Sequence, residues 1–541
     1  MHPIRTMLLA LAAICLMSCG DGSKTSSGGE VVFNRGNAAE PETLDPALAT
    51  GIFEDSIIGD VLMGLTTEDV NGKPIAGSAT SWETSADGLV WTFHLRDQTW
   101  SDGVPVTADD FVFGWQRLLD PATASKYAYF LYLVKNAEAV NKAKMPVSAL
   151  GVRAVDAKTF EVTLKHPAPY MLEMLTHTTT FPVPRHVVEK SGKDWVKPGN
   201  YIGNGAYTLV EWVPNDHITL KKNPRFYDAA HVQVDKVVFY PTNDYDAALR
   251  RFRAGELDIQ DRMPANQIDM VRSTMPGVMD PVPELTLELL SVNFKRPVFQ
   301  DVRVREALNL ALDRETITGK IRRLGEPPAY DYIPPGIVNY PHSNKFDFIS
   351  MPYAARVAKA QSLMQAAGYG PNKRLKTTLM IRLTSNDIER KVAAAIQQMW
   401  RAIYIDVEIV PQDTAIFYSK IQEHDFDIAK PGWGADFNDA SNFLDLLRTG
   451  TGNNWGAYSN PVFDRLMDQA QMERDLTKRG QLLAQAEGVA MKDQAWMPVL
   501  YWVGMEIKQP YVSGWKNNAM EKNRSRWVSI DTKARAAKFG H

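Results

Sequence analysis

The sequence predicts an α/β protein that folds as several domains. Three observations lead to this prediction: the chain has 541 residues, it is 45% hydrophobic and 23% charged, and its strand and helix patterns alternate. At roughly 150 residues per domain, this length gives three or four domains. The composition is that of a globular protein, and strands that alternate with helices are typical of sheets covered by helices.

The first 30 residues read as a signal peptide and a tether. Arg5 precedes the apolar run 7–17, which is too short to span a membrane but suits the core of a signal peptide. The sequence L-M-S-C-G at 16–20 resembles a bacterial lipobox, so we expect cleavage after residue 18 and lipidation of Cys19. Residues 20–30 are rich in Gly and Ser and predict a flexible tether. With Cys15 removed and Cys19 acylated, the mature protein would have no disulfide.

Two strands and a helix are predicted in the first third of the mature chain. Residues 91–95 and 160–164 alternate apolar and polar side chains, as half-buried strands do. Thr107, with Asp110 three positions later, forms a capping-box pattern that predicts a helix to about residue 119. The glycine-punctuated stretch 199–209 predicts a turn that leads into another strand.

The second half of the chain predicts three amphipathic helices. One lies within 297–317 after Asp301, a good N-cap residue. A second covers 351–367 and is closed by Gly368. A third covers 388–401 and leads into a strand over 405–410. No internal repeat and no long charged tail interrupts this pattern.

The stretch 427–443, D-I-A-K-P-G-W-G-A-D-F-N-D-A-S-N-F, is the strongest candidate for a binding segment. Gly432 and Gly434 leave the backbone accessible on both sides of Trp433, and Asp436 follows two residues later. Backbone hydrogen-bonding groups, an aromatic wall and a carboxylate together suit an extended ligand with an amine. The same composition also suits a turn with a core Trp and a helix-capping Asp, and local sequence leaves both interpretations open.

Local motifs of enzymes and of nucleic-acid binding are absent from the sequence. It contains no C-x-x-C, H-E-x-x-H, G-x-S-x-G, phosphate-binding loop or dinucleotide-binding glycine set, and its ten histidines share no metal-ligand spacing. The net charge of −3 gives no basic surface for nucleic acid. We therefore expect a protein that is not an enzyme and that has no cofactor, no metal and no nucleic-acid partner.

Several longer segments together resemble the extracellular solute-binding proteins of ABC importers. They resemble above all the periplasmic oligopeptide-binding proteins and their murein tripeptide-binding relative. The resemblance runs from about residue 31 to about 527. Its most specific segments are E-P-E-T-L-D-P (40–46), S-W-E-T-S-A-D-G-L-V-W-T-F-H-L-R (81–96), W-S-D-G-V-P-V-T-A-D-D-F-V-F-G-W-Q-R (100–117), P-G-N-Y-I-G-N-G-A-Y-T-L (198–209) and F-Q-D-V-R-V-R-E-A-L (299–308).

This resemblance implies a two-lobed periplasmic-binding-protein fold of type II, with a hinge and an additional third domain. The implied division places a signal peptide at 1–18 and a lipidated tether at 19–30. Lobe I would consist of 31–66, 190–286 and 505–541, the extra domain of 67–189, and lobe II of 287–504.

The resemblance also implies roles for individual residues. Asp436 matches the aspartate that receives the peptide α-amino group, and Gly432, Trp433 and Gly434 match the strand that pairs with the peptide backbone. On the opposing segment, the matching residues are Glu54, Asp55 and Ser56, and Phe130 replaces a tyrosine near the ligand. Where the family meets the peptide carboxylate with a histidine and two arginines, this sequence has Glu389, Ile421 and Lys430, so recognition of that end of the ligand departs from the family.

The function so implied is capture of short peptides by a lipoprotein that delivers them to the permease subunits of an ABC importer. The expected location is the periplasm, with a lipid anchor as the only membrane contact, in the outer membrane in preference to the inner one. A monomer is expected. Alternatives are a binder of murein tripeptide, of a nickel chelate, of haem or of an opine, and, more remotely, an extracytoplasmic hydrolase.

Overall fold

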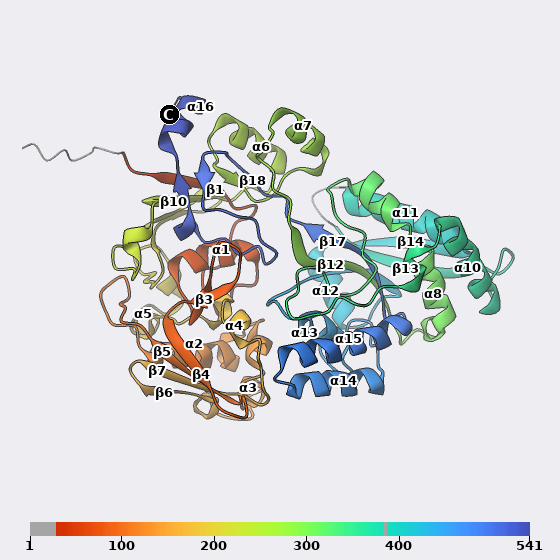
Figure 1. Cartoon of the computed structure of the whole chain (residues 1–541), viewed down its shortest axis with the longest axis horizontal. Helices are drawn as coiled ribbons and strands as arrows, with labels where there is room; N and C mark the ends of the chain where they lie inside the picture. The colour runs from red at the N-terminus through yellow and green to blue at the C-terminus, as the bar shows by residue number, and fades with distance from the viewer. Residues whose placement is uncertain (1–28, 384–386, 541) are drawn as a thin grey trace, which may run out of the picture. The chain divides into compact units, whose positions relative to one another are not determined.

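The structure is a computed structural model that describes residues 29–383 and 387–540. The predicted signal peptide, Cys19 and nearly all of the tether lie outside the described residues. Val31–His541 forms one compact unit, and three sheets organise it (Figure 1).

The first sheet is mixed and has six strands in the order β18-β11-β1-β10-β9-β8. Strand β1 runs parallel to β10 and β11, and the other pairs are antiparallel. Helix α1 packs against β8, and α6 packs against β11. The elements are β1 (Val32–Gly36), α1 (Ile52–Val61), β8 (Tyr207–Val213), β9 (His217–Lys222), β10 (Lys236–Tyr240), α6 (Tyr245–Ala254), β11 (Ile259–Gln260), α7 (Ile268–Thr274), β18 (Ile507–Lys508) and α16 (Thr532–Phe539).

The second sheet has four antiparallel strands in the order β4-β5-β7-β6, with α2 packed on β6 and β7. It shares one continuous apolar core with the first sheet, from Phe33 on β1 to Phe93 and Trp115 in the second sheet's layer. Its elements are β4 (Ala79–Thr84), β5 (Val90–Leu95), α2 (Ala108–Leu119), α3 (Ala137–Asn141), β6 (Val152–Asp156), β7 (Thr159–Thr163), α4 (Met171–Met174) and α5 (Arg185–Ser191). Two small hairpins accompany these sheets, β2 (Thr66–Glu68) with β3 (Pro74–Ala76) and β19 (Val512–Ser513) with β20 (Ser529–Ile530).

The third sheet has the order β14-β13-β15-β12-β16. Strands β15 and β16 pair with successive parts of one edge of β12, and β17 pairs with its opposite edge. Helix α11 packs on β13 and β14, and this layer has a core of its own. The elements are β12 (Pro283–Val292), α8 (Val302–Leu310), α9 (Arg314–Thr316), α10 (Tyr353–Ala366), β13 (Leu375–Arg382), α11 (Ile388–Arg401), β14 (Ile405–Gln412), α12 (Thr414–Gln422), β15 (Ile428–Lys430), β16 (Gly432–Gly434), α13 (Ser441–Leu444), α14 (Pro461–Met472), α15 (Leu476–Lys492) and β17 (Trp496–Val503).

Most predicted elements are confirmed. The capping box starts α2, where the Asp110 carboxylate accepts the Thr107 backbone N–H at 2.8 Å. The second and third predicted helices are α10 and α11, and Gly368 after α10 has a φ of +89°, which favours glycine.

The helix predicted within 297–317 is shorter than its apolar pattern suggests. The Asp301 side chain accepts the Arg303 N–H and starts α8, which ends at Leu310. Asp313 then accepts the Thr316 N–H and begins a new, short helix. A capping aspartate competes with helix continuation because its side chain offers the backbone another hydrogen-bond partner.

Two segments run side by side where the chain passes between the first and third sheets. The Gly504 N–H donates to the Val282 carbonyl and the Lys508 N–H to the Val278 carbonyl, both at 2.9 Å. These segments lead directly into β12 and out of β17, which lie together in the middle of the molecule (Figure 1). The first and third sheets are therefore connected by two hydrogen-bonded segments.

Buried carboxylates outnumber cations around this connection. The Arg262 guanidinium lies 3.4 Å from the Glu284 carboxylate and 2.7 Å from that of Glu521. Burial and the nearby charge of Asp261 raise the pKa of Glu506 to about 8, although Arg35 acts in the opposite direction. The groups that face one another are Asp261, Glu284, Glu506, Glu521, Arg35, Arg262 and Trp515, whose Nε1 donates to Glu506 at 3.3 Å.

We expect Glu506→Gln to stabilise the protein at pH 8 but not at pH 5. The folded protein keeps a proton on Glu506 up to about pH 8, whereas the unfolded chain releases it near its ordinary pKa of 4.5. The stability that this group contributes is therefore complete at low pH and is lost as the pH rises towards 8. Glutamine has no proton to lose. At pH 8 the free energy of unfolding of the Glu506→Gln protein should therefore exceed that of the original protein by on the order of 1–3 kcal/mol.

Urea denaturation at the two pH values measures this difference. The exposed Glu408 on β14 supplies the control variant, Glu408→Gln, for which no pH-dependent gain is expected. An equal effect of Glu506→Gln at pH 5 and pH 8 would contradict the raised pKa.

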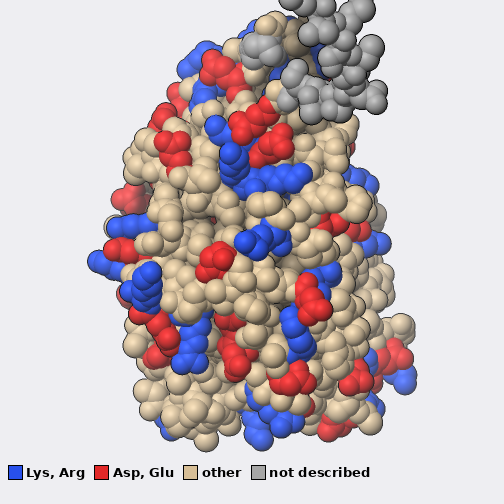
Figure 2. Space-filling model, turned by 90° about the vertical axis from the view of Figure 1, so that its left-hand side faces the viewer, with Lys and Arg blue, Asp and Glu red and all other residues tan. Residues whose placement is uncertain are grey.

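Charges of both signs mix on the surface. On the face shown in Figure 2, the basic and acidic side chains of the described residues are interspersed, so this face carries no broad patch of one sign.

Candidate functional site

The stretch 427–443 forms the edge of the third sheet. Pro431 separates β15 from β16, and both strands lie along the same side of β12. Strand β15 also pairs with β13, but β16 pairs, among the described residues, only with β12. Gly432, Trp433 and Gly434 are therefore an open strand edge with backbone groups that another extended chain could use.

Asp436 lies just beyond this edge and faces two tyrosines from the second sheet's layer. The Tyr127 and Tyr129 hydroxyls donate to its two carboxylate oxygens, each at a long 3.4 Å. Burial raises the pKa of Asp436 to about 6, although the charge of Lys522 and the two hydroxyls act in the opposite direction. The carboxylate is thus ionised at neutral pH, half-buried and weakly bonded, which makes it a good acceptor for an incoming cation.

Asn442 holds the aromatic and acidic parts of this segment together. Its Oδ1 accepts Trp433 Nε1 at 2.7 Å and the Asp436 backbone N–H at 3.4 Å. The Trp433 ring also makes an edge contact with Trp455, with ring centres 5.8 Å apart. Asn442 is buried at the start of α13, so a rigid helix fixes both candidate ligand contacts.

Two cavities meet at Asp436. The smaller, of about 100 Å³, is also lined by Asp55, Tyr127, His177 and Lys522. The larger, of about 960 Å³, is also lined by Trp433 and Phe130 and lies between residues 126–174 and 422–471. This volume is at the upper end of the usual range for ligand pockets.

The side chains of residues 54–56 on α1 point to different places, one to the smaller cavity and two to the protein interior. Asp55 lines the smaller cavity. Glu54 is buried, and its carboxylate accepts the Glu42 backbone N–H at 2.9 Å. The Ser56 hydroxyl accepts from Arg35 at 2.9 Å. Of the three predicted contacts on this segment, Asp55 is the one that lines either of these two cavities.

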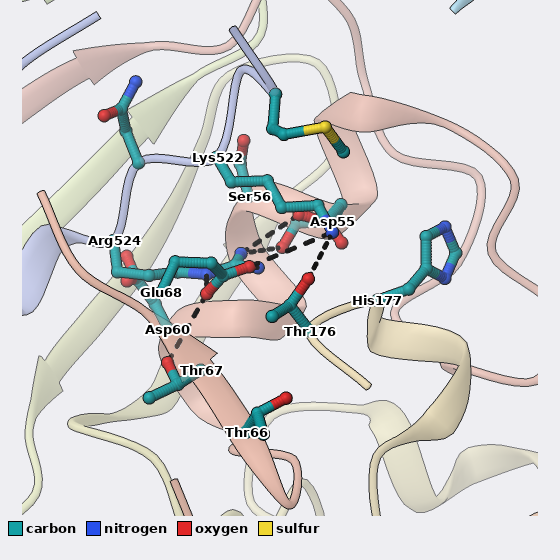
Figure 3. Close-up of polar contacts among 12 residues, drawn as sticks. Asp55, Ser56, Asp60, Thr66, Thr67, Glu68, Thr176, His177, Lys522 and Arg524 are labelled. Carbon is teal, nitrogen blue, oxygen red and sulfur yellow. Dashed lines mark hydrogen bonds and ion pairs between the residues drawn. The ribbon is translucent and has the colours of Figure 1, made fainter. Parts of the chain in front are cut away.

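A buried network of charges fixes Asp55 (Figure 3). Arg524 Nη1 donates to its carboxylate at 3.0 Å, while Nη2 and Nε donate to the two oxygens of Glu68 at 2.8 and 3.1 Å. Lys522 bonds Thr176 at 3.0 Å. Burial alone would raise the pKa of Asp55, but Arg524 and Lys522 outweigh it and lower the pKa to about 2. Asp55 is thus neutralised internally, and of Asp55 and Asp436, which both line the smaller cavity, Asp436 is the one without a cation bonded to it.

Aromatic rings form the wall beside Asp436. Phe130 is buried, with its ring centre 4.7 Å from that of His177 and 6.1 Å from that of Phe437. Tyr127 stacks on Tyr129 with ring centres 5.5 Å apart. Burial lowers the pKa of His177 to about 3, so this ring is neutral at pH 7 and acts as part of the wall.

Lys430, Glu389 and Ile421 are not among the residues that line either cavity. Lys430 on β15 is buried and pairs with Glu389 at 2.5 Å and with Glu288. Burial opposes its charge, but the two carboxylates outweigh burial and raise the pKa of Lys430. Ile421 is fully buried in an apolar cluster with Phe417. The three positions that the resemblance matched to the carboxylate-binding residues of the family thus hold an internal ion pair and a core residue.

Three residues of the site were not predicted from the sequence. Tyr127 and Tyr129 flank Asp436 but lie 309 and 307 positions away in the chain, so nothing local connects them. Both tyrosines lie in the segment 126–131, K-Y-A-Y-F-L, whose Phe130 was matched to a family residue near the ligand, and this match was the only signal for them. Asn442 lies within the candidate stretch 427–443, but nothing in the sequence indicates a role for it.

Residues 29–383 and 387–540 contain neither a metal-binding cluster nor a membrane-spanning helix. No group of three His, Cys, Asp or Glu side chains there could hold a metal ion. In the same ranges, every helix is too short or too polar to cross a membrane.

Comparison with known proteins identifies the family. The family described as bacterial extracellular solute-binding proteins, family 5 Middle, matches residues 73–455. The periplasmic oligopeptide-binding protein OppA of Salmonella typhimurium is 36% identical over 520 residues, which are 95% of this chain and 94% of OppA. The chain belongs to the bacterial extracellular solute-binding proteins of family 5.

Solved structures of this family share the fold. The Escherichia coli murein tripeptide-binding protein MppA has a TM-score of 0.82 at 34% identity, and the match covers 93% of this chain and 99% of MppA. Haemophilus influenzae OppA in complex with RPPGFSPFR has a TM-score of 0.80 at 33% identity, with coverage of 93% and 99%. These are two-lobed periplasmic binding proteins, so the predicted fold class is confirmed. This family 5 protein is similar to binding proteins rather than to enzymes.

Proposed function

We propose that this family 5 protein captures short peptides in the larger cavity and delivers them to the permease of an ABC importer. The observation that carries the proposal is Asp436, a half-buried and weakly bonded carboxylate that adjoins the open edge of β16 at the junction of two cavities. A peptide amine would replace the two long tyrosine contacts, and the peptide backbone would pair with Gly432–Gly434 by strand addition.

The relatives support a peptide as the ligand. OppA of Salmonella typhimurium is an oligopeptide-binding protein, and that of Haemophilus influenzae was solved with RPPGFSPFR. Recognition through backbone groups tolerates many side chains because every peptide presents the same main chain. Murein tripeptide is the second candidate ligand, favoured by the similarity to MppA.

The remaining features of the proposal concern location and assembly. We propose that Cys19 carries a lipid anchor, that the tether holds the folded unit in the periplasm, and that the anchor lies in the outer membrane. The protein would act as a monomer with the permease subunits as its partners and would not turn its ligand over. Roles for Glu54 and Ser56 in this scheme are structural, since their side chains bond the protein itself.

Mass spectrometry of the protein purified under native conditions tests the ligand class. We expect retained masses that denaturation releases and that fragment as short peptides; a muropeptide mass would select the second candidate. Calorimetry with di- to pentapeptides should then reproduce binding in solution. Retention of a haem, a nickel chelate or an opine, with no binding of any peptide, would contradict the proposal.

Peptide affinity should fall as the pH drops below 6. The pKa of Asp436 in the empty site is about 6, so about nine-tenths of the carboxylates are ionised at pH 7 and about one-tenth at pH 5. The peptide amine stays charged over this range, and only the ionised carboxylate can pair with it. We expect about a tenfold rise in the dissociation constant between pH 7 and pH 5, measured by calorimetry. An N-acetylated peptide that showed the same pH dependence would contradict the assignment to Asp436.

A further inference from the structure

We propose that the larger cavity selects acidic peptides, which bind with the amine on Asp436 and with carboxylates on lysines across the cavity. This inference rests on the proposed peptide-binding function and names the ligand class within it. It starts from the distribution of charge over the two walls of the cavity. The N-terminal wall is the lining contributed by residues 126–174, and the C-terminal wall is that contributed by residues 422–471.

The N-terminal wall has an excess of positive charge. Its charged lining residues are Lys126, Lys142, Lys165 and Glu138. Glu138 pairs with Lys142 at 2.6 Å and lies 3.9 Å from Lys165, so one carboxylate serves two ammonium groups. Lys126 is exposed and makes no ion pair with any residue that the structure describes. Two cations on this wall are therefore unbalanced.

The C-terminal wall has the opposite balance. Its charged lining residues are Asp436, Asp445 and Arg448. Arg448 already pairs with Asp468 and lies 3.8 Å from Asp445, so it is not free to bind a ligand anion. Among the residues that the structure describes, the Asp436 carboxylate accepts hydrogen bonds only from the two tyrosine hydroxyls. This wall therefore offers an acceptor for an amine and no unpaired cation.

The two walls together determine which ligand charges fit. A peptide that places its amine on Asp436 presents the rest of its length to a cavity whose facing wall is positive. Acidic side chains and the terminal carboxylate meet an excess of lysine charge there, whereas basic side chains meet like charge. Lys142 and Lys165 keep 53% and 39% of their side chains exposed. A contact between either lysine and a ligand carboxylate is therefore weak while water surrounds it, and it gains strength as the bound ligand displaces that water.

Peptides of one length but different charge test the inference. The probes are tetrapeptides with a free amine, of the forms Ala-Ala-Ala-Ala, Ala-Glu-Glu-Ala and Ala-Lys-Lys-Ala, measured by calorimetry at pH 7.5. We expect the acidic peptide to bind about tenfold more tightly than the neutral one and the basic peptide to bind most weakly. Raising the salt from 50 to 500 mM should reduce the acidic preference and weaken the acidic peptide more than the neutral one, which has fewer charges to screen.

Variants locate the preference on the N-terminal wall. The double variant Lys126→Ala with Lys165→Ala should lose most of the preference for the acidic peptide, whereas the neutral peptide, which has only its terminal carboxylate to place on this wall, should lose much less affinity. The matched control is Lys144→Ala with Lys193→Ala, two exposed lysines that do not line the cavity and should leave the preference intact.

Each outcome decides a separate point. Equal binding of acidic and neutral peptides, or an equal loss of preference in the control variant, would overturn the inference and leave the proposed peptide binding in place. Failure of all three peptides to bind would contradict the proposed function itself. A preference that survives in Lys126→Ala with Lys165→Ala would show that the selecting cations lie elsewhere.

Discussion

Asp436→Asn is expected to raise the dissociation constant of a free-amine peptide by about 10- to 100-fold, because a hydrogen bond between charged groups contributes roughly 1.5–3 kcal/mol. Asparagine keeps the size of the side chain and can still accept from Tyr127 or Tyr129. The change therefore removes the charge while the surrounding wall remains. Calorimetry with one peptide on both proteins measures the loss.

Asp425→Asn provides a matched control for this variant. Asp425 is exposed, pairs with Lys420 at 3.0 Å and lines neither cavity, so its substitution should leave peptide affinity unchanged. An Asp436→Asn protein that bound the peptide within about twofold of the original would remove Asp436 from the account. Unchanged thermal denaturation of both variants would show that the comparison reports binding and not unfolding.

Arg524→Met is expected to lower the free energy of unfolding by about 3–5 kcal/mol, the usual cost of removing one partner from a buried ion pair. Arg524 donates to both oxygens of Glu68 and to Asp55, and the Arg524 and Glu68 side chains are 3% and 1% exposed. Without the guanidinium, the nearest cation to Glu68 is Lys522 at 3.9 Å. Two carboxylates would then be buried with little compensation.

Urea denaturation at pH 7 measures this loss, and Arg524→Lys tests its cause. Lysine restores the charge but cannot bond Glu68 through two nitrogens, so an intermediate loss is expected. A loss below about 1 kcal/mol for Arg524→Met would show that the network contributes little to stability. Peptide affinity of whichever variants stay folded would report whether this network also positions Asp55 at the smaller cavity.

Local sequence signals predicted the elements well because their causes are local. The Thr107 and Asp110 pair makes its hydrogen bond within one turn of α2, so the pattern alone locates the start of the helix. The apolar pattern through Leu312 overestimated α8, since the Asp313 side chain starts a new helix where the pattern would continue the old one.

The candidate site was predictable only in part because its partners are distant in sequence. Asp436 and Trp433 are close along the chain, and both reach the larger cavity. Their opposing residues, Tyr127 and Tyr129, come from another layer of the fold, and no local pattern links them to Asp436. Lys430 shows the same limit: the sequence does not reveal that Glu288, on a neighbouring strand, neutralises it.

The most direct test of the central claim compares a free-amine peptide with its N-acetylated form on the original protein and on Asp436→Asn. If Asp436 holds the amine, acetylation weakens binding to the original protein about 10- to 100-fold and has little further effect on the variant, so the two losses are not additive. Equal losses on acetylation in both proteins would contradict the claim, because the amine would then be recognised by another group.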